Sequence, residues 1–477
     1  MSQEHDTPNG MALNRRRFLR TMALGTAAVA TGLLAACSAT KPAAAPEATA
    51  APDAAAPAAT AAPAATEAPA TDAATGEAAK FKALMWSNSP VLDENFKKRA
   101  DLFNAKYKGK YEVDMQLLPW DQYWPKVDLA YASKDPIDVY FWDVQAYGHY
   151  KQGLLKNVQE EVNVAADLSN PELYPTKLFD VWRFDGANLF AIPENLQMMQ
   201  MYYNKDLFDK AGVKYPDASW TWNDVLAAAA KLKISEGDTV TQWGFDIGDL
   251  GVWWGAQTLA WDQGGAFFDK IVEPTKFTVS EEKSVNGLKF IQDAMYVNKM
   301  APDQATRSIV GQDVGIFASG KVAMTPGGSW GMSGYADLKF KWDVAPLPKW
   351  TDMTVMPYWF GGWVVAKDGK HTDAATAWAI WCATEYQQTM AETRDWIPIR
   401  TDARNSAAFL GGLPAGFKTV LDTLPDAKLG DMYHKAGQQI LGEVFGPILD
   451  QFWNNKVTAA DAGKQIDEKA NALLAKG

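Results

Sequence analysis

From Phe81 on, short apolar runs alternate along the chain with amphipathic stretches. Short apolar runs at 81–86, 111–118 and 137–142 predict β-strands, and amphipathic segments at 96–107 and 123–132 predict helices between them. Strands that alternate with helices in this way are typical of an α/β fold. The sequence therefore predicts an α/β body that begins near residue 80.

Polar residues follow the predicted strands at the points where they end. Ligands of open α/β sheets bind beyond the carboxyl ends of the strands. We therefore expect a cleft at this edge of the sheet, lined by Ser87, Asn88, Asp143 and Gln145. For Asp143 the alternative role is a cap of the following helix, because aspartate is a preferred N-cap residue.

The first 36 residues have the pattern of an export signal. Three arginines, at positions 15–17, precede an apolar stretch, 22–34, that is too short to span a membrane comfortably. Residues 14–20 (NRRRFLR) resemble the twin-arginine export motif, and residues 34–37 (LAAC) resemble a lipobox, in which Cys37 is acylated. We predict that residues 1–36 are removed and that Cys37 carries a lipid, by either the twin-arginine or the general secretory route.

Residues 37–79 are predicted to form a tether between that lipid and the body. Alanine, proline and threonine dominate the segment, and it contains no aromatic or branched aliphatic side chain. Such a composition cannot bury enough apolar surface to offset its conformational entropy. We expect a flexible spacer that holds the body near a membrane surface.

Composition excludes several classes of function. The formal charge of -11, without a compensating basic block, argues against nucleic acid as a partner. Two cysteines and four scattered histidines predict neither a disulfide scaffold nor a histidine metal site, and we expect the histidines at the surface. Twenty tryptophans are an excess that suggests planar stacking on a ligand.

Several sequence blocks follow one another in the order and spacing of a known family. They are 138–143 (DVYFWD) with 153–155 (GLL), 192–193 (IP) with 203–208 (YNKDLF), 211–212 (AG) and 220–222 (WTW), 317–324 (FASGKVAM) with 328–330 (GSW), 345–348 (APLP), and 361–366 (GGWVVA). Each block is weak alone. Together they resemble family 1 extracellular solute-binding proteins, the sugar-type receptors of ABC importers, over nearly all of residues 80–477.

The resemblance implies a two-lobed periplasmic-binding-protein fold of type II, with a ligand cleft between the lobes. Its expected boundaries are 80–192 for the first part of the N-terminal lobe, 193–356 for the first part of the C-terminal lobe, 357–400 for the return, and 401–477 for C-terminal helices. The hinge strands are expected at 189–203 and 357–365. The implied protein is a monomer on the outer face of the bacterial cytoplasmic membrane, whose partners are a carbohydrate and an ABC permease with its ATPase.

A sugar site combines hydrogen-bonding carboxylates or amides with aromatic rings that stack on C–H faces. Asn195 and Gln197 lie two apart on the expected hinge strand and share a face, whereas Glu194 points the other way. Gln197 matches a position where related receptors can carry a carboxylate. Trp142 matches an aromatic position of the family, although packing in the core is an equal alternative for this ring.

Three tryptophans are the expected stacking residues. Trp330 matches the family's stacking position, Trp254 belongs to a Trp253-Trp254 pair in a glycine-flanked segment that we interpret as a loop, and Trp359 precedes Gly361 and Gly362. The two glycines would let the backbone approach a ligand closely. The remaining tryptophans are expected in the core, including Trp378 and Trp381, which lie three apart in a predicted helix.

Arg400 has two alternative roles, as a ligand contact or as the partner of an acid at the lobe interface. Cys382 is expected to be a buried small apolar residue.

No catalytic residues, metal or cofactor are predicted, since the sequence contains no nucleophile triad order, HExxH motif or phosphate-binding glycine loop. Two alternatives to a sugar receptor stay open. The first is the same fold with another solute, such as a polyamine or a phosphate ester. The second is a secreted glycoside hydrolase, which needs two carboxylates across the scissile bond.

Overall fold

The computed structural model of this protein describes residues 77–87, 90–142, 144–175, 177–310, 315–335, 337–350 and 356–476. The predicted export signal, the lipidation site Cys37 and most of the predicted tether lie outside the described residues. The same holds for two predicted site residues, Asn88 and Asp143.

Nine of the described strands form one mixed sheet. The eleven strands in the described ranges are β1 (Ala79–Ser87), β2 (Tyr111–Pro119), β3 (Val139–Phe141), β4 (Ile192–Asn204), β5 (Ile234–Glu236), β6 (Thr239–Gln242), β7 (Met324–Gly328), β8 (Trp342–Ala345), β9 (Pro357–Val365), β10 (Ile397–Pro398) and β11 (Lys428–Leu429). The main order is β10-β4-β9-β3-β1-β2, while β11 pairs with β9, both β7 and β8 pair with β4, and β5 and β6 form a separate hairpin.

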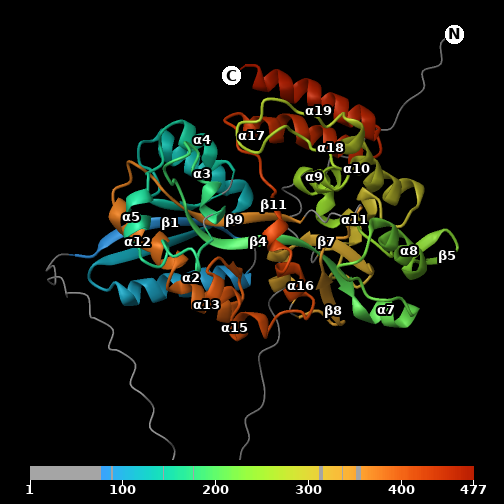
Figure 1. The fold of residues 1–477 in the computed structure, drawn as a ribbon, viewed down its shortest axis with the longest axis horizontal. Helices are drawn as coiled ribbons and strands as arrows, with labels where there is room; N and C mark the ends of the chain where they lie inside the picture. The colour runs from blue at the N-terminus through green and yellow to red at the C-terminus, as the bar shows by residue number, and fades with distance from the viewer. Residues whose placement is uncertain are drawn as a thin grey trace, which may run out of the picture. The chain divides into compact units, whose positions relative to one another are not determined.

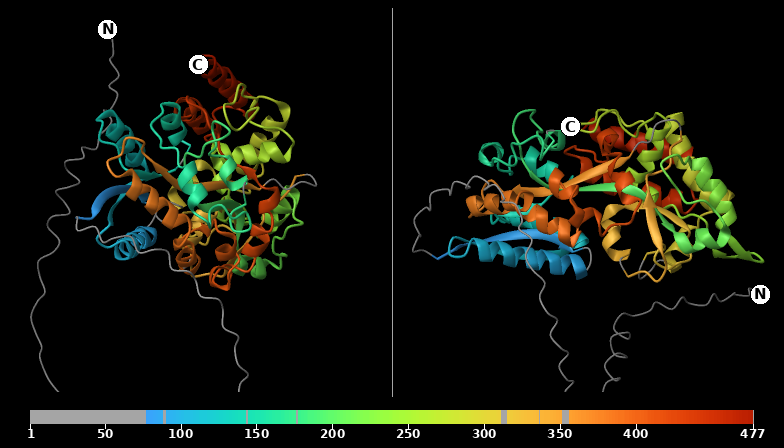
Figure 2. Two further views of the ribbon diagram at one scale, coloured as in Figure 1. Left: turned by 60° about the vertical axis from the view of Figure 1, so that its left-hand side comes forward. Right: turned by 60° about the horizontal axis from the view of Figure 1, so that its bottom comes forward.

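Helices cover both faces of this sheet (Figures 1 and 2). The described helices are α2 (Pro90–Lys106), α3 (Trp120–Ala132), α4 (Ala146–Lys151), α5 (Gln159–Val164), α6 (Lys177–Asp180), α7 (Lys205–Ala211), α8 (Trp222–Leu232), α9 (Trp253–Asp262), α10 (Glu282–Gln292), α11 (Gln304–Val310), α12 (Thr372–Ala383), α13 (Tyr386–Thr393), α14 (Thr401–Arg404), α15 (Ala407–Leu410), α16 (Phe417–Leu421), α17 (Gly437–Gln439), α18 (Gly446–Trp453) and α19 (Ala459–Leu474).

The α/β alternation predicted for the start of the body is confirmed. The run 81–86 lies within β1, 111–118 lies within β2, and 137–142 contains the shorter strand β3. Strands β1, β2 and β3 are parallel to one another, and the central strand β1 pairs with both of the others. Parallel neighbours end at the same edge, so the ends of β1 and β3 come together there.

Strand β4 runs through two parts of the molecule. Its first half pairs with β9, from Ile192 opposite Trp363 to Met198 opposite Tyr358. Its second half pairs with β7 and β8 on its two sides, up to Asn204 opposite Trp342. The Asn204 side chain then accepts a hydrogen bond from the backbone N–H of Leu207 at 3.2 Å and so caps helix α7.

We call the part around β1, β2, β3 and α12 the first lobe, and the part around β7, β8, α9, α10 and α19 the second lobe. Figure 1 shows β4 and β9 between them. Both crossing strands coincide with the segments that the sequence predicts as hinges. The chain positions at which the predicted lobe boundaries fall stay a prediction.

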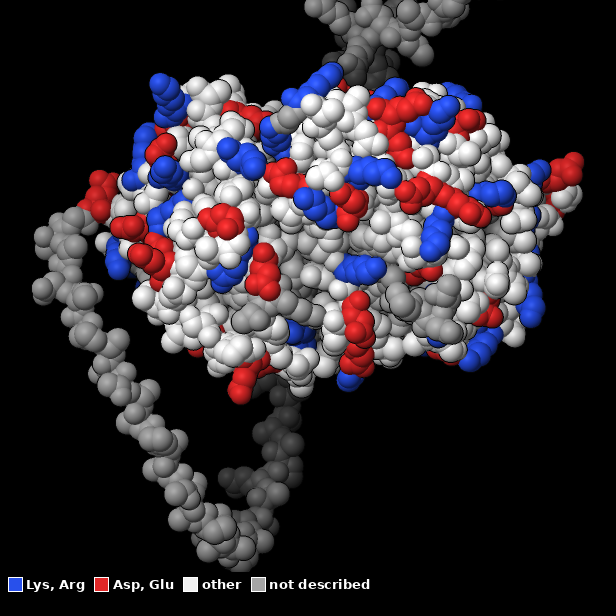
Figure 3. All heavy atoms as spheres, turned by 45° about the horizontal axis from the view of Figure 1, so that its top comes forward, with Lys and Arg blue, Asp and Glu red and all other residues white. Residues whose placement is uncertain are grey.

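Charged side chains of both signs are mixed on the face shown in Figure 3, without a broad region of either sign. Within the described ranges, no helix is both long and apolar enough to cross a membrane.

Candidate functional site

A cavity of about 620 Å³ lies where the ends of β1 and β3 meet the crossing strands. Trp86 comes from β1, Phe141 from β3, and Asn195 and Gln197 come from β4. Second-lobe residues, among them Trp254 of α9, also line the cavity. The cavity therefore lies where the carboxyl-end rule for α/β sheets predicts it.

Three tryptophans form one wall as a mutually edge-on cluster. The ring centroids of Trp254 and Trp359 are 4.9 Å apart, those of Trp330 and Trp359 are 5.5 Å apart, and those of Trp254 and Trp330 are 5.6 Å apart. The interplanar angles lie between 71° and 83°. Each ring braces the other two, so the apolar faces are fixed before a ligand arrives. The structure brings together all three rings that the sequence predicts.

The sequence underestimates the number of tryptophans in this cavity. Trp253 lines the cavity together with its neighbour Trp254, and so do three rings that the sequence did not assign to the site, namely Trp86, Trp120 and Trp396. Trp120 is 46% exposed, whereas the sequence places it in the core. It meets Trp86 edge-on with ring centroids 5.1 Å apart. The signal for Trp86 was its place near the end of the first strand, next to the predicted Ser87.

Several polar atoms in the cavity lining have no hydrogen-bond partner among the described residues. They are Asn195 Nδ2, Trp142 Nε1 and Gln145 Oε1, and each is buried. Trp142 also packs in the core, 2% exposed and stacked on Phe184 with ring centroids 5.3 Å apart. The packing and lining roles of Trp142 thus coexist. A buried polar group without a partner is costly, and these atoms are two donors and one acceptor.

Gln197 lines the cavity, but its amide is engaged within the protein. Its Oε1 accepts a hydrogen bond from Ser329 Oγ at 2.7 Å, and its Nε2 donates to Asn195 Oδ1 at 3.3 Å. Ser329 begins the 3-10 helix that carries Trp330. Gln197 therefore holds Trp330's segment against β4 and orients the Asn195 amide.

The two predicted glycines have different neighbours. A Cβ on Gly361 would lie 2.4 Å from the Phe141 ring and 2.7 Å from Asn195 Nδ2, so glycine leaves the space that this amide occupies. A Cβ on Gly362 would lie 2.5 Å from the carbonyl oxygen of Ile192, and Gly362 does not line the cavity. Gly361 thus belongs to the cavity wall, and Gly362 permits close packing of β9 against β4.

Two polar residues from the C-terminal segment complete the lining, Asp431 and Gln438. Asp431 Oδ2 accepts a hydrogen bond from the Tyr433 hydroxyl at 2.8 Å. Asp431 is the one charged side chain among the described lining residues, and none of them is lysine or arginine. The sequence did not indicate either residue, because both follow β11, far along the chain from the predicted cleft.

Behind the crossing strands, a buried ionic network fixes β4. Arg99 of α2 donates to Glu194 of β4, and its Nη2 lies 3.0 Å from Asp395 Oδ2. Trp363 of β9 donates to the second oxygen of Glu194. Burial raises the pKa of Glu194 to about 7, and the Arg99 guanidinium opposes that shift. Glu194 points away from the cavity, as predicted, and anchors the strand that carries Asn195.

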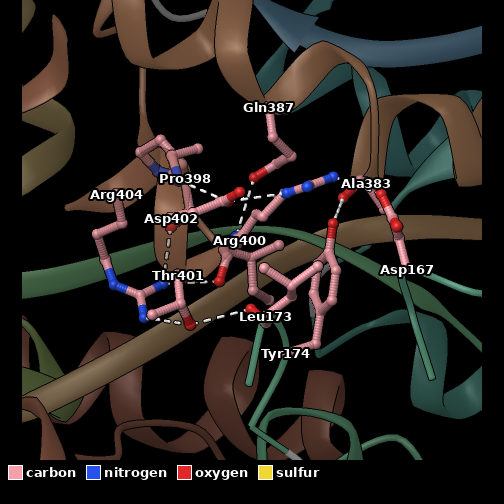
Figure 4. A network of polar contacts seen from close by, with 12 residues as sticks. Asp167, Leu173, Tyr174, Ala383, Gln387, Pro398, Arg400, Thr401, Asp402 and Arg404 are labelled. Atoms are coloured by element: carbon pink, nitrogen blue, oxygen red, sulfur yellow. Dashed lines mark hydrogen bonds and ion pairs between the residues drawn. The ribbon is translucent and has the colours of Figure 1, made fainter. Parts of the chain in front are cut away.

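Ser87 and Arg400 do not line the cavity. The Ser87 hydroxyl donates to Asp93 Oδ2 at 2.8 Å. Arg400 Nη1 lies 2.5 Å from Asp167 Oδ2, and its Nε lies 2.8 Å from Asp402 Oδ1, within the polar network of Figure 4. Of the two roles that the sequence leaves open for Arg400, these contacts correspond to pairing with acids.

Two expectations about local structure are wrong. The Trp253-Trp254 pair lies in the first turn of helix α9 and not in a loop, because the apolar face of residues 253–262 packs inward. His149 and His434 are buried and not at the surface. His149 Nδ1 is 2.8 Å from the Tyr140 hydroxyl and its Nε2 is 2.8 Å from Asp128 Oδ1, so these partners satisfy both ring nitrogens.

Other expectations of burial are confirmed. Cys382, Trp378 and Trp381 are all buried, the last being 6% exposed.

Clusters of metal-ligating side chains are absent from the described residues. No group of three or more His, Cys, Asp or Glu side chains is placed there to hold a metal ion.

The sequence profile of the bacterial extracellular solute-binding proteins matches residues 86–389, which is more than half of the chain. The chain belongs to this family. The match includes both crossing strands and seven of the eight tryptophans of the cavity, because only Trp396 lies beyond residue 389.

Relatives of this solute-binding protein include two from Bacillus subtilis. The maltodextrin-binding protein MdxE is 23% identical over 50% of this chain and 56% of its own length. An arabinooligosaccharide-binding protein is 20% identical over 64% of this chain and 69% of its own length. The chain thus spans only about half the length of the first of these relatives.

A solved structure confirms the two-lobed periplasmic-binding-protein fold. The ABC substrate-binding protein from Listeria monocytogenes in complex with cycloalternan superimposes with a TM-score of 0.74 at 23% identity. The superposition covers 84% of this chain and 100% of the other. The fold class predicted from the sequence is therefore correct.

Proposed function

We propose that this solute-binding protein is a lipid-anchored receptor that captures a carbohydrate in the cavity between its lobes and delivers it to an ABC importer. The observation that carries the proposal is the combination, in the lining of one cavity, of tryptophan rings with amide and indole groups that lack a hydrogen-bond partner among the described residues. Sugars present apolar C–H faces and hydroxyls that both donate and accept hydrogen bonds. This cavity offers a counterpart for each.

The charge of the lining supports a neutral ligand. A phosphate ester needs clustered cationic side chains, and the described lining contains none. A polyamine needs several converging acids, and the described lining contains Asp431 alone. The same single carboxylate argues against a glycoside hydrolase, which uses a pair. The Bacillus relatives named for maltodextrin and arabinooligosaccharide support the choice of a carbohydrate.

A thermal-unfolding screen of the full chain tests the ligand class. Neutral mono- and oligosaccharides, polyamines, sugar phosphates and amino acids are added separately at high concentration. A ligand present at about 100 times its Kd should stabilise the folded protein by about 2.7 kcal/mol. We expect the shift from a neutral saccharide. A shift with a polyamine or sugar phosphate alone contradicts the proposal, and release of shorter saccharides during incubation indicates a hydrolase.

Anchoring and delivery need separate tests in a bacterial cell. The variant Cys37→Ala should leave the membrane fraction, and mass spectrometry of the wild-type protein should detect acyl groups on Cys37. A wild-type protein without acyl groups contradicts the anchor. Cells without the receptor should lose uptake of the identified saccharide, and unchanged uptake contradicts the delivery role.

A further inference from the structure

The lobes touch at a second place, away from the crossing strands. Helix α4 of the first lobe contributes Tyr147 and Lys151, and the loop between α9 and α10 of the second lobe contributes Glu273. The Tyr147 hydroxyl donates to Glu273 Oε1 at 2.7 Å, and Lys151 Nζ lies 3.0 Å from the same oxygen. His434 Nε2 lies 3.4 Å from Glu273 Oε2. Side chains of both lobes therefore meet at one carboxylate.

The backbone presents Glu273 in an unusual way. Its φ is 51°, in the left-handed region that residues other than glycine rarely adopt. Its N–H donates to the carbonyl of Tyr433 at 2.7 Å, and the Tyr433 N–H donates to the carbonyl of Ile271 at 2.8 Å. This short ladder holds the loop in this left-handed form.

Tyr433 connects this contact to the cavity. Its hydroxyl donates to Asp431 Oδ2 at 2.8 Å, and Asp431 lines the cavity. Its ring packs against first-lobe rings, with centroids 6.0 Å from Trp142 and 6.0 Å from Tyr147. Trp142 also lines the cavity. A ligand that contacts Asp431 or Trp142 thus touches groups that hold the Glu273 contact in place.

We infer that Glu273 is an interlobe latch, which stabilises the approach of the two lobes seen here, and that Tyr433 couples the latch to occupancy of the cavity. Separation of the lobes breaks the charge-assisted bonds from Tyr147 and Lys151, while the two hinge strands stay paired. The latch itself does not depend on a sugar. Its coupling to a sugar rests on the proposed function.

Interlobe distances measured by pulsed electron paramagnetic resonance test the latch. Spin labels are placed on Asp101→Cys in α2 and Lys469→Cys in α19, at two exposed positions. The full chains also carry Cys37→Ser, so that Cys382, which is fully buried, is the one native cysteine left. In the absence of sugar, Glu273→Gln should shift the distance distribution toward larger separations. Tyr147→Phe should produce the same shift. Distributions identical to that of the parent chain in both variants overturn the latch.

Glu161→Gln is the matched control. Glu161 pairs with Lys156 inside the first lobe, and its side chain is 35% exposed, as is that of Glu273. This control should leave the interlobe distances unchanged, and a shift as large as that of Glu273→Gln overturns the latch. Unfolding curves that coincide with that of the parent chain establish that the variants fold.

The coupling is tested with the saccharide found in the screen. Glu273→Gln should raise its dissociation rate about five-fold, since exposed charge pairs contribute up to that factor. Tyr433→Phe keeps the ring but removes the hydroxyl, so it should weaken the closure produced by the sugar. Full closure in Tyr433→Phe overturns the coupling. If no saccharide binds the parent chain, the proposed function and the coupling to sugar fail, and the distances in the empty protein still decide the latch.

Discussion

Removal of the Trp330 ring should weaken sugar binding without unfolding the protein. In Trp330→Ala the cavity loses one stacking face and two edge-on contacts, with Trp254 at 5.6 Å and Trp359 at 5.5 Å. Each aromatic pair contributes about 0.5–1.5 kcal/mol, so the free energy of unfolding should fall by roughly 1–3 kcal/mol. Truncation of an anchoring tryptophan in a binding site typically costs about 2 kcal/mol or more, which is roughly a 30-fold increase in Kd.

Isothermal titration calorimetry with the identified saccharide measures the change in Kd, and urea unfolding measures the stability. Trp350→Ala is the matched control, because Trp350 is also half-buried and meets one ring, Phe290, edge-on at 5.0 Å. Trp350 does not line the cavity. The control should lose stability and keep its Kd.

A Kd for Trp330→Ala within about three-fold of the wild-type value would refute a stacking role for this ring, because that ratio corresponds to less than about 0.7 kcal/mol. Equal increases in Kd for Trp330→Ala and Trp350→Ala would also refute it. In that case the loss would follow from general destabilisation and not from contact with the sugar.

Three further perturbations test the surroundings of the site. Arg99→Met removes the cation that pairs with two buried carboxylates, Glu194 and Asp395. Urea unfolding should therefore show a free energy of unfolding that is lower by about 3–5 kcal/mol, and a decrease below about 1 kcal/mol contradicts the network. Burial raises the pKa of Asp249 from 3.8 to about 6. Between these two pH values the folded state binds more protons than the unfolded state. The stability that protonated Asp249 contributes is therefore complete below pH 3.8 and is lost as the pH rises through 6. Asp249→Asn should flatten the pH dependence of unfolding in this window, and an unchanged slope contradicts the shift. Gly361→Ala places a methyl group against the side-chain amide of Asn195. Calorimetry should therefore detect no saccharide binding at concentrations that saturate the wild type. A Kd equal to that of the wild type contradicts the assignment of Gly361 to the cavity wall.

Local patterns predict the scaffold of the site well. The apolar runs at 81–86 and 111–118 become β1 and β2, and the rule for strand ends places the cavity at the correct edge. The alternation on β4 separates Asn195 and Gln197 from Glu194, because successive side chains of a strand face opposite ways. These features are determined by residues that are close in sequence, so local patterns are enough to predict them.

Contacts between distant segments are not predictable from the same patterns. Asp431 reaches the cavity through the pairing of β11 with β9, which no periodicity near residue 431 indicates. The sequence places Trp120 in the core, but the turn from β2 into α3 leaves its ring at the cavity. The loop expected at Trp253 is a helix start, because packing of the later turns of α9 outweighs the two flanking glycines.

The division of strand β4 between two sheet halves has a consequence for how this protein denatures. One lobe uses residues 192–198 as a sheet partner of β9, and the other uses residues 199–204 as the partner of β7 and β8. Loss of either half leaves the remaining half with exposed backbone hydrogen-bonding groups and a frayed strand end. The lobes should therefore melt together, as one cooperative calorimetric transition of the folded body, although each has its own helices and its own set of rings.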